Sequence, residues 1–173
     1  RSVGQVLYDL MHEHEGRRII TACFASHIHR IQQIADAAIA FGRVVAPLGR
    51  SMKRNITLSR ELGLLSIPDS SIIDIEQVDS YEPGEVLVLS TGSQGEPMSA
   101  LTLLAANENR WLKLTPEDTV ILSSHNMFEV ERLCHRVAMI DKGEIVLIGT
   151  PSELKERYDA GNLEEVFLKA VRP

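Results

Sequence analysis

Apolar runs of strand length alternate with longer stretches of helical periodicity along this chain. Four near-continuously apolar runs predict strands, at residues 17–24, 43–48, 85–90 and 119–124. Such runs are typical of strands buried on both faces of a parallel sheet. Two further runs, 136–141 and 144–149, are joined by Asp141-Lys142-Gly143. That junction predicts an antiparallel hairpin.

Helical patterns fill the intervals between these runs. Residues 26–42 place one apolar face on Ile28, Ile31, Ile34, Ala35, Ala38 and Ile39, and Gly42 is a stop signal. The other helices are predicted at 51–63, 96–105, 126–134, 151–158 and 162–171. The segment 64–84 is expected to be irregular, because Pro68, Pro83 and Gly84 interrupt any period.

Strand–helix alternation predicts right-handed crossovers and an α/β fold. We expect a doubly wound, mainly parallel, three-layer sheet of Rossmann-like or flavodoxin-like type, with a C-terminal hairpin and helices. The first and third strands are expected to be neighbours, in the order 2-1-3-4. A length of 173 residues, with 44% hydrophobic and 24% charged residues, predicts a single domain over 1–173.

Composition narrows the classes of partner. The net charge of −6 argues against non-specific binding of polyanions over the whole surface, but it leaves room for a local basic site. No apolar run approaches the ~20 residues of a membrane helix. The two cysteines, Cys23 and Cys134, form no pattern and are interpreted as reduced core residues. We therefore expect a cytoplasmic protein without a membrane partner.

Two loops carry candidate phosphate chemistry, because each would leave the carboxyl end of a parallel strand and enter a helix. Ligands bind at such positions in open α/β sheets, and helix N-termini favour anions. The candidate residues, in loops 24–30 and 90–97, are Ser26, His29, Arg30, Thr91, Gly92, Ser93 and Gly95. The alternative is that these glycines and hydroxyls are turn residues and helix caps without a ligand.

Other polar clusters are less specific. Arg50, Lys53 and Arg54 form the best basic patch, although solvated charges on a helix are the more common explanation. The histidine pairs His12/His14 and His27/His29 have i, i+2 spacing. Side chains at that spacing point away from each other on a helix, so neither pair predicts a metal site.

Several long stretches carry a family resemblance. They read RRIITACFASHIHRIQQIADAAIAFGR, GRSMKRN, ELGLLSIP, STGSQGEPMSAL and DTVILSSH. On these stretches residues 1–125 resemble the β-CASP domain of bacterial ribonuclease J. The resemblance implies a domain that grips RNA rather than one that holds metal.

The C-terminal part resembles a different family. The stretch SSHNMFEVERLCHRVAMIDKGEIVLIGTPSELKERY is similar to the C-terminal part of an ATP-binding-cassette (ABC) transporter ATPase, over residues 123–173. The two resemblances meet at Ser123-Ser124-His125. The ATPase resemblance makes His125 the equivalent of the switch histidine that contacts ATP, whereas the ribonuclease resemblance makes it the end of a strand.

Neither family's catalytic residues are complete in this sequence. The resemblance to ribonuclease J implies two zinc ions on a His-x-His-x-Asp-His cluster, and cassette ATPases need a Gly-x-x-x-x-Gly-Lys-Ser/Thr loop. Both motifs are missing from the sequence. We therefore expect no enzyme activity, no catalytic or metal-ligating residues, no cofactor and no ATP binding.

Three interpretations of function remain open. The first is a chimera of the two families without native catalysis, whether engineered, natural or an assembly product. The second is a module that weakly binds RNA or phosphate-type anions through the loops at 24–30 and 90–97. The third is a fragment of a zinc-dependent ribonuclease.

The junction itself has a predicted structure. Helix 126–134 should begin after an Asn126 cap, with Glu129 completing a capping box. Its apolar face should hold Met127, Val130 and Cys134, while Glu131 and Arg132 stay in solvent. The hairpin should bury Val137, Met139, Ile145 and Leu147, so that both parts share one core.

Overall fold

The computed structural model describes residues 3–92, 98–142 and 144–171. The chain divides into two compact units. The larger unit comprises residues 7–123, and the smaller comprises residues 1–6 with 124–173. Each unit is described by itself.

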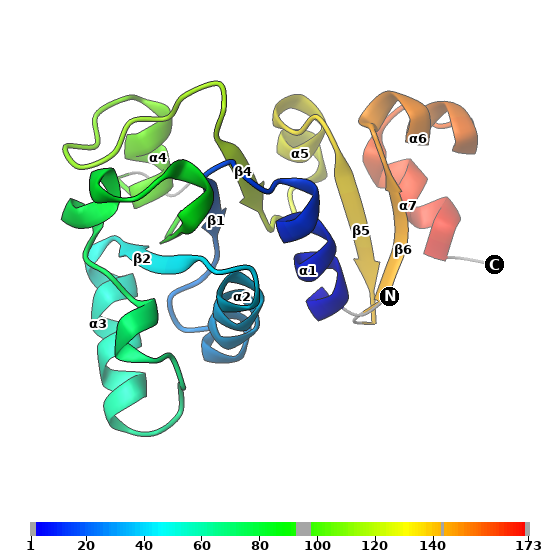
Figure 1. The fold of residues 1–173 in the computed structure, drawn as a ribbon. Coiled ribbons are helices and arrows are strands. Elements are labelled where there is room, and N and C mark those ends of the chain that lie inside the picture. The colour runs from blue at the N-terminus through cyan, green and yellow to red at the C-terminus, as the bar shows by residue number, and fades with distance from the viewer. Residues whose placement is uncertain (1–2, 93–97, 143, 172–173) are drawn as a thin grey trace. The chain divides into compact units, whose positions relative to one another are not determined.

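A four-stranded parallel sheet forms the centre of the larger unit (Figure 1). Its strands are β1 (Ile19–Ala22), β2 (Val44–Leu48), β3 (Val86–Ser90) and β4 (Thr119–Leu122). The α/β class, the parallel sheet and the pairing of β1 with β3 are confirmed. The expected order 2-1-3-4 is wrong, because the sheet runs β2-β3-β1-β4. Both orders place β1 and β3 in the interior, so the apolar pattern does not distinguish which edge strand each one pairs with.

The two edges of this sheet differ in their cover. β1 and β3 are buried at every residue, as predicted. β4 is not buried on both faces, since it lies at an edge and Val120 is 42% exposed. At the other edge Ile72 bridges to Val45, and the Ile73 N–H donates to the Val45 carbonyl at 3.0 Å. The irregular segment therefore covers the β2 edge through the short 3₁₀ turns η1 (Asp69–Ser71) and η2 (Ile75–Ser80), while η3 (Pro83–Glu85) leads into β3.

Helices cover both faces of the sheet. They are α2 (Ile28–Ala40), α3 (Arg50–Glu61) and α4 (Ala100–Ala105), while α1 (Val3–Glu13) has residues in both units. In Figure 1, α4 lies above the sheet, while α2 and α3 lie below it. Alternate strand residues such as Ile20 and Val88 pack with Leu104 of α4 and with Leu112 in one core cluster. The three-layer arrangement follows from strands that are apolar on both faces.

A buried ion pair joins the starts of β1 and β4. The Arg18 guanidinium donates to both Asp118 oxygens, at 3.0 and 2.7 Å, and also to the Lys113 carbonyl at 3.0 Å. The Asp118 carboxylate also accepts from the Thr115 N–H at 2.8 Å. The two side chains are only 12% and 4% exposed. Charge-assisted bidentate geometry of this kind holds two strand ends in register.

A second buried arginine joins three further backbone segments. Arg43 is 2% exposed. Its guanidinium donates to the carbonyls of His14 at 2.9 Å, Arg17 at 2.8 Å and Val86 at 3.3 Å. It thereby connects the end of the first helical segment to the starts of β1 and β3.

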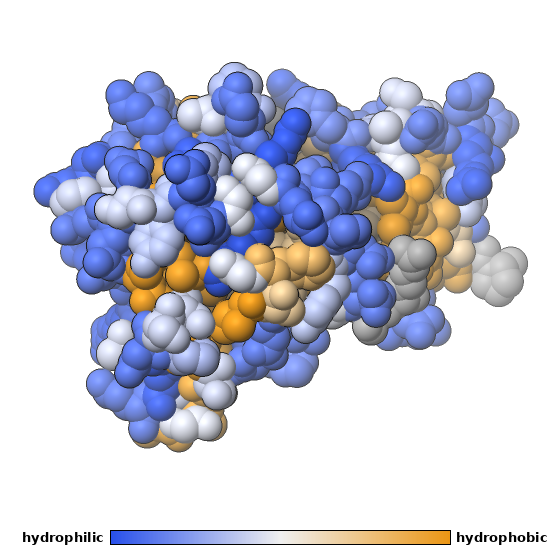
Figure 2. Space-filling model, viewed as in Figure 1, coloured by the Kyte–Doolittle hydropathy of each residue, from blue (hydrophilic) through white to orange (hydrophobic). Residues whose placement is uncertain are grey.

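The smaller unit packs a hairpin against three helices. Its elements are α5 (Met127–Leu133), β5 (Val137–Asp141), β6 (Glu144–Gly149), α6 (Pro151–Tyr158) and α7 (Leu163–Val171). The antiparallel pairing of β5 with β6 is confirmed. Val137, Met139 and Leu147 are buried, whereas Ile145 is only half-buried. The alternate residues Ile140, Val146 and Ile148 are 38–41% exposed. Figure 2 shows hydrophobic surface over β6 and α7.

The junction helix follows its prediction in part. α5 begins at Met127, Val130 is buried, and Met127 and Cys134 are half-buried. The side chain of Glu129, and with it the predicted capping box, lies outside the described residues. Arg132 is exposed, as predicted.

Glu131 was predicted to stay in solvent, and that prediction is wrong. Its carboxylate accepts from Lys155 Nζ of α6 at 2.5 Å and from the Leu163 N–H at the start of α7 at 3.0 Å. A polar residue beside an apolar stripe was expected to face water, but here two neighbouring helices supply donors. Glu131 therefore joins all three helices of this unit.

We expect the contribution of Glu131 to stability to depend on pH. The hydrogen bond from Lys155, then that from Leu163, lowers the pKa of Glu131. A depressed pKa means that the contribution is present above the unfolded pKa of about 4.3 and is lost as pH falls through the folded pKa. In urea denaturation, Glu131→Gln should be less stable than the parent at neutral pH, and the difference should shrink below about pH 4. Glu156→Gln, at an exposed position of α6, is the control. A difference independent of pH would contradict the assignment.

Candidate functional site

Three loops leave the carboxyl edge of the sheet side by side. β1 and β3 are in register so that Ala22 pairs with Ser90, and β2 pairs Leu48 with the same Ser90. The Cys23 N–H continues this pattern by donating to the Ser90 carbonyl at 3.1 Å. The segments that follow these strands therefore begin at one edge, which is where open α/β sheets bind ligands.

Specific contacts hold the loops together. Asn55 of α3 donates from Nδ2 to the Ala25 carbonyl at 2.9 Å, which ties α3 to the loop after β1. Gly49, with φ +101°, lies so close to the loop after β3 that a Cβ there would be 3.0 Å from Thr91 Oγ1. A side chain at Gly49 would thus be strained both in backbone conformation and in space. The residues Asn55 and Gly49 were not singled out from the sequence, and only their close approach to other loops identifies them.

The candidate residues at this edge differ in their exposure to solvent. Ser26 and His29 are exposed, at the entry and on the first turn of α2, and Arg30 is half-buried. Thr91 is half-buried and Gly92 is buried. Ser93 and Gly95 lie outside the described residues.

The first N–H groups of α4 have partners within the chain. The Ala100 N–H donates to Thr91 Oγ1 at 3.4 Å and the Leu101 N–H donates to the Thr91 carbonyl at 3.0 Å. The Thr102 N–H donates to Ser99 Oγ at 3.3 Å. Thr91 and the N-cap residue Ser99 thus accept from the first turn of α4, as the helix-cap alternative expects, although a hydroxyl that accepts one bond still has its own O–H to donate. The sequence placed an anion at the start of this helix, but its backbone donors are already used.

Gly92 has a steric role at the same loop. Its φ is +102°, and an added Cβ would lie 2.2 Å from Ser99 Oγ and 2.8 Å from Ser99 Cβ. Only glycine fits this combination of left-handed backbone and close packing. The glycine therefore lets the loop fold back onto the cap of α4.

The N-termini of α2 and α3 differ from that of α4. Their N-cap residues, His27 and Gly49, make no side-chain cap bond. The first turns of a helix carry backbone N–H groups without an intrahelical partner and a partial positive charge. Both helices begin at the carboxyl edge of the sheet, with 13 and 12 residues respectively. At the start of α2 one of these donors is already used within the chain, because the Ile28 N–H donates to the Ser26 carbonyl at 3.1 Å.

Basic side chains flank these N-termini. Arg30 lies on the first turn of α2, and Arg50, Lys53 and Arg54 lie on the first turns of α3. Lys53 Nζ is 3.6 Å from an Asp74 oxygen, and both side chains are exposed. Arg50 and Arg54 are exposed to solvent. The basic patch noted in the sequence is therefore adjacent to the candidate loops.

Cys23 lies where β1 ends, close to Arg30. Burial raises the pKa of the Cys23 thiol to about 11, and the charge of Arg30 opposes that rise. Because the thiolate is the reactive form, we expect Cys23 of the folded protein to resist a thiol reagent at pH 8. The Cys134→Ala variant reports on Cys23 alone, and the same variant unfolded in guanidinium is the control. Folding favours the neutral thiol, so its contribution to stability should decline as pH rises from about 8.5 towards the folded value. Rapid labelling of the folded Cys134→Ala variant at pH 8 would contradict the prediction that Cys23 resists the reagent.

The histidines do not assemble into a metal site. Among the described residues, no group of three or more His, Cys, Asp or Glu side chains is arranged to hold a metal ion. His12 pairs through Nδ1 with Glu15 at 2.8 Å on an exposed surface. His125 is exposed in the loop that precedes α5, within the smaller unit. No helix in the described part of the chain is long and apolar enough to cross a membrane.

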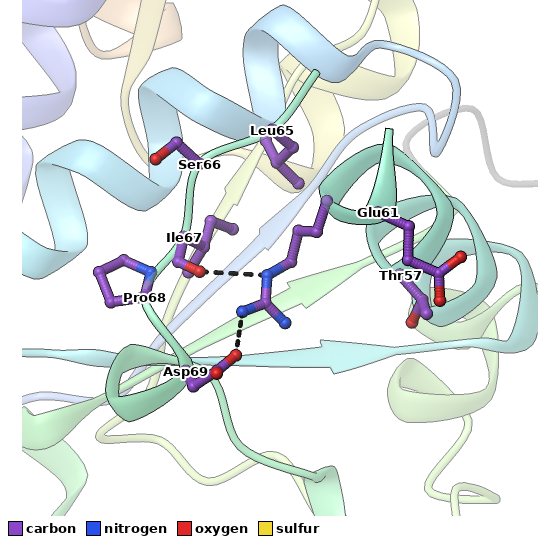
Figure 3. A pocket seen from close by; sticks show the side chains of 8 residues that line it. Thr57, Glu61, Leu65, Ser66, Ile67, Pro68 and Asp69 are labelled. Carbon is purple, nitrogen blue, oxygen red and sulfur yellow. Dashed lines mark hydrogen bonds and ion pairs between the residues drawn. The ribbon is translucent and has the colours of Figure 1, made fainter. Parts of the chain in front are cut away.

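An open hollow of about 460 Å³ beside α3 has a structural role (Figure 3). It is lined by the end of α3 and by residues 65–69. Within it Arg60 donates from Nε to the Ile67 carbonyl at 3.1 Å and pairs with Asp69. Because the loop itself engages the guanidinium, this arginine fastens residues 67–69 to α3.

Comparison with known proteins identifies relatives of the chain. The family model described as "Ribonuclease J, beta-CASP domain" matches residues 16–142. Ribonuclease J of Mycolicibacterium smegmatis is 49% identical over 70% of this chain, and that of Helicobacter pylori J99 is 40% identical over 68%. Ribonuclease J 1 of Streptococcus pyogenes is 36% identical over 99% of this chain. The chain spans 22%, 17% and 31% of these three relatives, respectively.

Proposed function

This chain belongs to the β-CASP domain family of ribonuclease J, and from that premise we propose that it binds RNA through phosphates at the carboxyl edge of its four-stranded sheet. The observation that carries the proposal is the pair of helix N-termini without side-chain caps, those of α2 and α3, beside Arg30, Arg50 and Arg54. The relatives are named for action on RNA, and this edge offers what an RNA backbone needs.

Each part of the site has a role in this proposal. The backbone N–H groups of the first turn of α3, and those of α2 after Ile28, donate to phosphate oxygens, favoured by the helix dipoles. The hydroxyls of Ser26 and Thr91 add neutral donors. The arginines supply the charge that attracts the backbone from solution, against a chain whose net charge is −6. Because the attraction is local, binding is weak and falls steeply with salt.

Fluorescence anisotropy of a labelled RNA of about ten nucleotides tests the proposal. The parent chain should bind at low salt, with an affinity that declines linearly on a log–log plot against salt. The variant with Arg30, Arg50 and Arg54 all changed to Ala should bind at least tenfold more weakly and with a shallower salt slope. Arg157→Ala, an exposed arginine of α6, is the matched control. Equal binding by the triple variant and the parent would refute the site.

Catalysis by the chain alone is a separate question. We propose that the chain binds RNA without zinc-dependent RNA cleavage or ATP hydrolysis. The proposal rests on the incomplete motifs of both families. Turnover of RNA or ATP by a preparation free of host enzymes, abolished by His125→Ala, would overturn it. Zinc-dependent cleavage that survives that change would support the interpretation as a fragment of a zinc ribonuclease.

Whether residues 123–173 derive from ribonuclease J or from an ABC transporter ATPase is a second question, and observations favour each answer. The compact units divide between residues 123 and 124, close to where the resemblance to an ABC transporter ATPase begins, although the ribonuclease J family model continues across this point to residue 142. That coincidence favours a chimera whose role is structural. The streptococcal relative aligns over 99% of this chain, which favours one origin. Amplifying the junction from the source DNA decides between them, because a single continuous coding sequence in a ribonuclease gene would exclude the chimera.

A further inference from the structure

A second hollow lies at the opposite, amino edge of the same sheet. It has a volume of about 390 Å³ and is lined by Arg18, Asp79, Arg110, Trp111, Leu112, Lys113 and Thr115. Arg18 directly precedes β1, and the segment 110–115 leads into β4. Strands of a parallel sheet share one direction, so this hollow is on the far side of the sheet from the loops of the proposed RNA site.

The tryptophan of this hollow is both accessible and held in place. Trp111 is 38% exposed, and the Arg110 guanidinium lies 4.1 Å from the centre of its ring. The side chain of Asn109 accepts from the N–H groups of Trp111 at 2.9 Å and Leu112 at 3.1 Å. Leu112, only 3% exposed, anchors the turn in the core cluster. An aromatic ring on such a turn loses little freedom when it binds a second ring.

The charges around the ring are mixed but favour an anion at the rim. Arg18 is neutralised by Asp118, and Asp79 contributes one negative charge to the lining. Arg110 and Lys113 are both exposed next to the tryptophan. An aromatic ring with one cation over it and a second exposed cation two residues further along the chain is a combination with which proteins bind single-stranded nucleic acid, by stacking a base and attracting its phosphate.

We propose that this hollow stacks a base of single-stranded RNA on Trp111, with the neighbouring phosphates attracted by Arg110 and Lys113. The ligand class is that of the proposed function, but the surface is different. An RNA strand that contacts both edges would pass across the larger unit, and the base contact would add affinity that depends less on salt than the phosphate contacts do.

Intrinsic fluorescence tests the proposal directly, because the chain contains one tryptophan. Oligoadenylate of about ten nucleotides should quench and saturate the signal of the intact chain. An abasic oligonucleotide of the same length supplies phosphates without bases and should bind without that quenching. Trp111→Leu should weaken binding of oligoadenylate by about tenfold, as measured by anisotropy, while Trp111→Phe, which keeps a ring, should lose less.

Another arginine–aromatic pair provides matched controls. Arg132 lies 5.7 Å from the ring centre of Phe128, which is 71% exposed. Phe128→Leu and Arg132→Ala should leave binding unchanged, and circular dichroism verifies that every variant folds. If these changes weaken binding as much as Trp111→Leu does, the hollow is not specific and the proposal fails.

The outcomes separate this proposal from that for the carboxyl edge. RNA that binds by anisotropy, loses affinity in the triple arginine variant and leaves tryptophan fluorescence unchanged would overturn the stacking site alone. Quenching by oligoadenylate that persists in the triple variant would support the stacking site even if the carboxyl edge fails. Equal quenching by the abasic oligonucleotide would mean that no base stacks on Trp111, and would refute the proposal.

Discussion

Replacing Arg18 with alanine is expected to destabilise the larger unit by about 3 kcal/mol or more, because it leaves Asp118 as a buried carboxylate without its cation. The pair is bidentate, and the two side chains are 12% and 4% exposed. Loss of the guanidinium also removes the donor to the Lys113 carbonyl. The free energy of unfolding, from urea denaturation at pH 7, measures the effect. A loss of about 3 kcal/mol would be a large share of the free energy of unfolding of a typical domain, which is about 5–15 kcal/mol.

The matched control is the exposed pair of Arg60 with Asp69, whose carboxylate is 96% exposed. Asp69→Asn should cost at most about 1 kcal/mol, as surface pairs do. The double variant Arg18→Met, Asp118→Leu should recover stability relative to Arg18→Ala, because apolar groups need no partner when buried. A cost for Arg18→Ala no larger than that of Asp69→Asn would show that water solvates the Asp118 carboxylate.

Replacing Met139 with alanine is expected to destabilise the smaller unit by about 2–5 kcal/mol, the usual range for a large apolar side chain removed from a core. Met139 is 2% exposed and pairs across the hairpin with Leu147, which is also buried. Truncation removes dispersion contacts and leaves a cavity. The neighbouring residue Ile140, 41% exposed on the other face of the same strand, supplies the control, since Ile140→Ala should change stability by less than about 1 kcal/mol.

The two variants together test the prediction of a single domain over residues 1–173. If both parts share one core, Arg18→Ala and Met139→Ala should each lower the midpoint of the same cooperative transition. The isolated fragment of residues 1–125 should then unfold at a lower denaturant concentration than the intact chain. Two transitions, each shifted by only one of the variants, would mean that the C-terminal part folds as an independent unit.

Local patterns identified most elements of the fold. The hairpin of β5 and β6 was predictable because Asp141-Lys142-Gly143 separates two apolar runs by a turn of hairpin length. The 151–158 helix was predicted at its observed bounds, and in the structure Thr150 caps it, with Glu153 completing a capping box. Both signals act between residues a few positions apart, so they are written in the sequence.

The candidate site was predictable only in outline. The loops after β1 and β3 were expected to lie at one edge, which follows from the parallel direction of the strands. That Thr91 accepts from the Ala100 N–H could not be predicted, because this contact depends on how the loop returns to Ala100. The approach of Gly49 to Thr91 depends on β2 lying beside β3, and that pairing was not predicted.

By itself, the sequence determined the class of fold, the places of the strands and of the helices that follow β1, and the family to which the chain belongs, whereas the helix α1 was not predicted. Periodicity, turn residues and long matching stretches are local or linear properties, and a single chain displays them in full. Only the tertiary structure decided the order of the strands and the partners of Arg18, Arg43 and Glu131. It also brought Arg110 and Trp111 to a hollow shared with Arg18. Such contacts join residues far apart in the chain, and their free energy depends on burial and distance, which arise only when the elements pack.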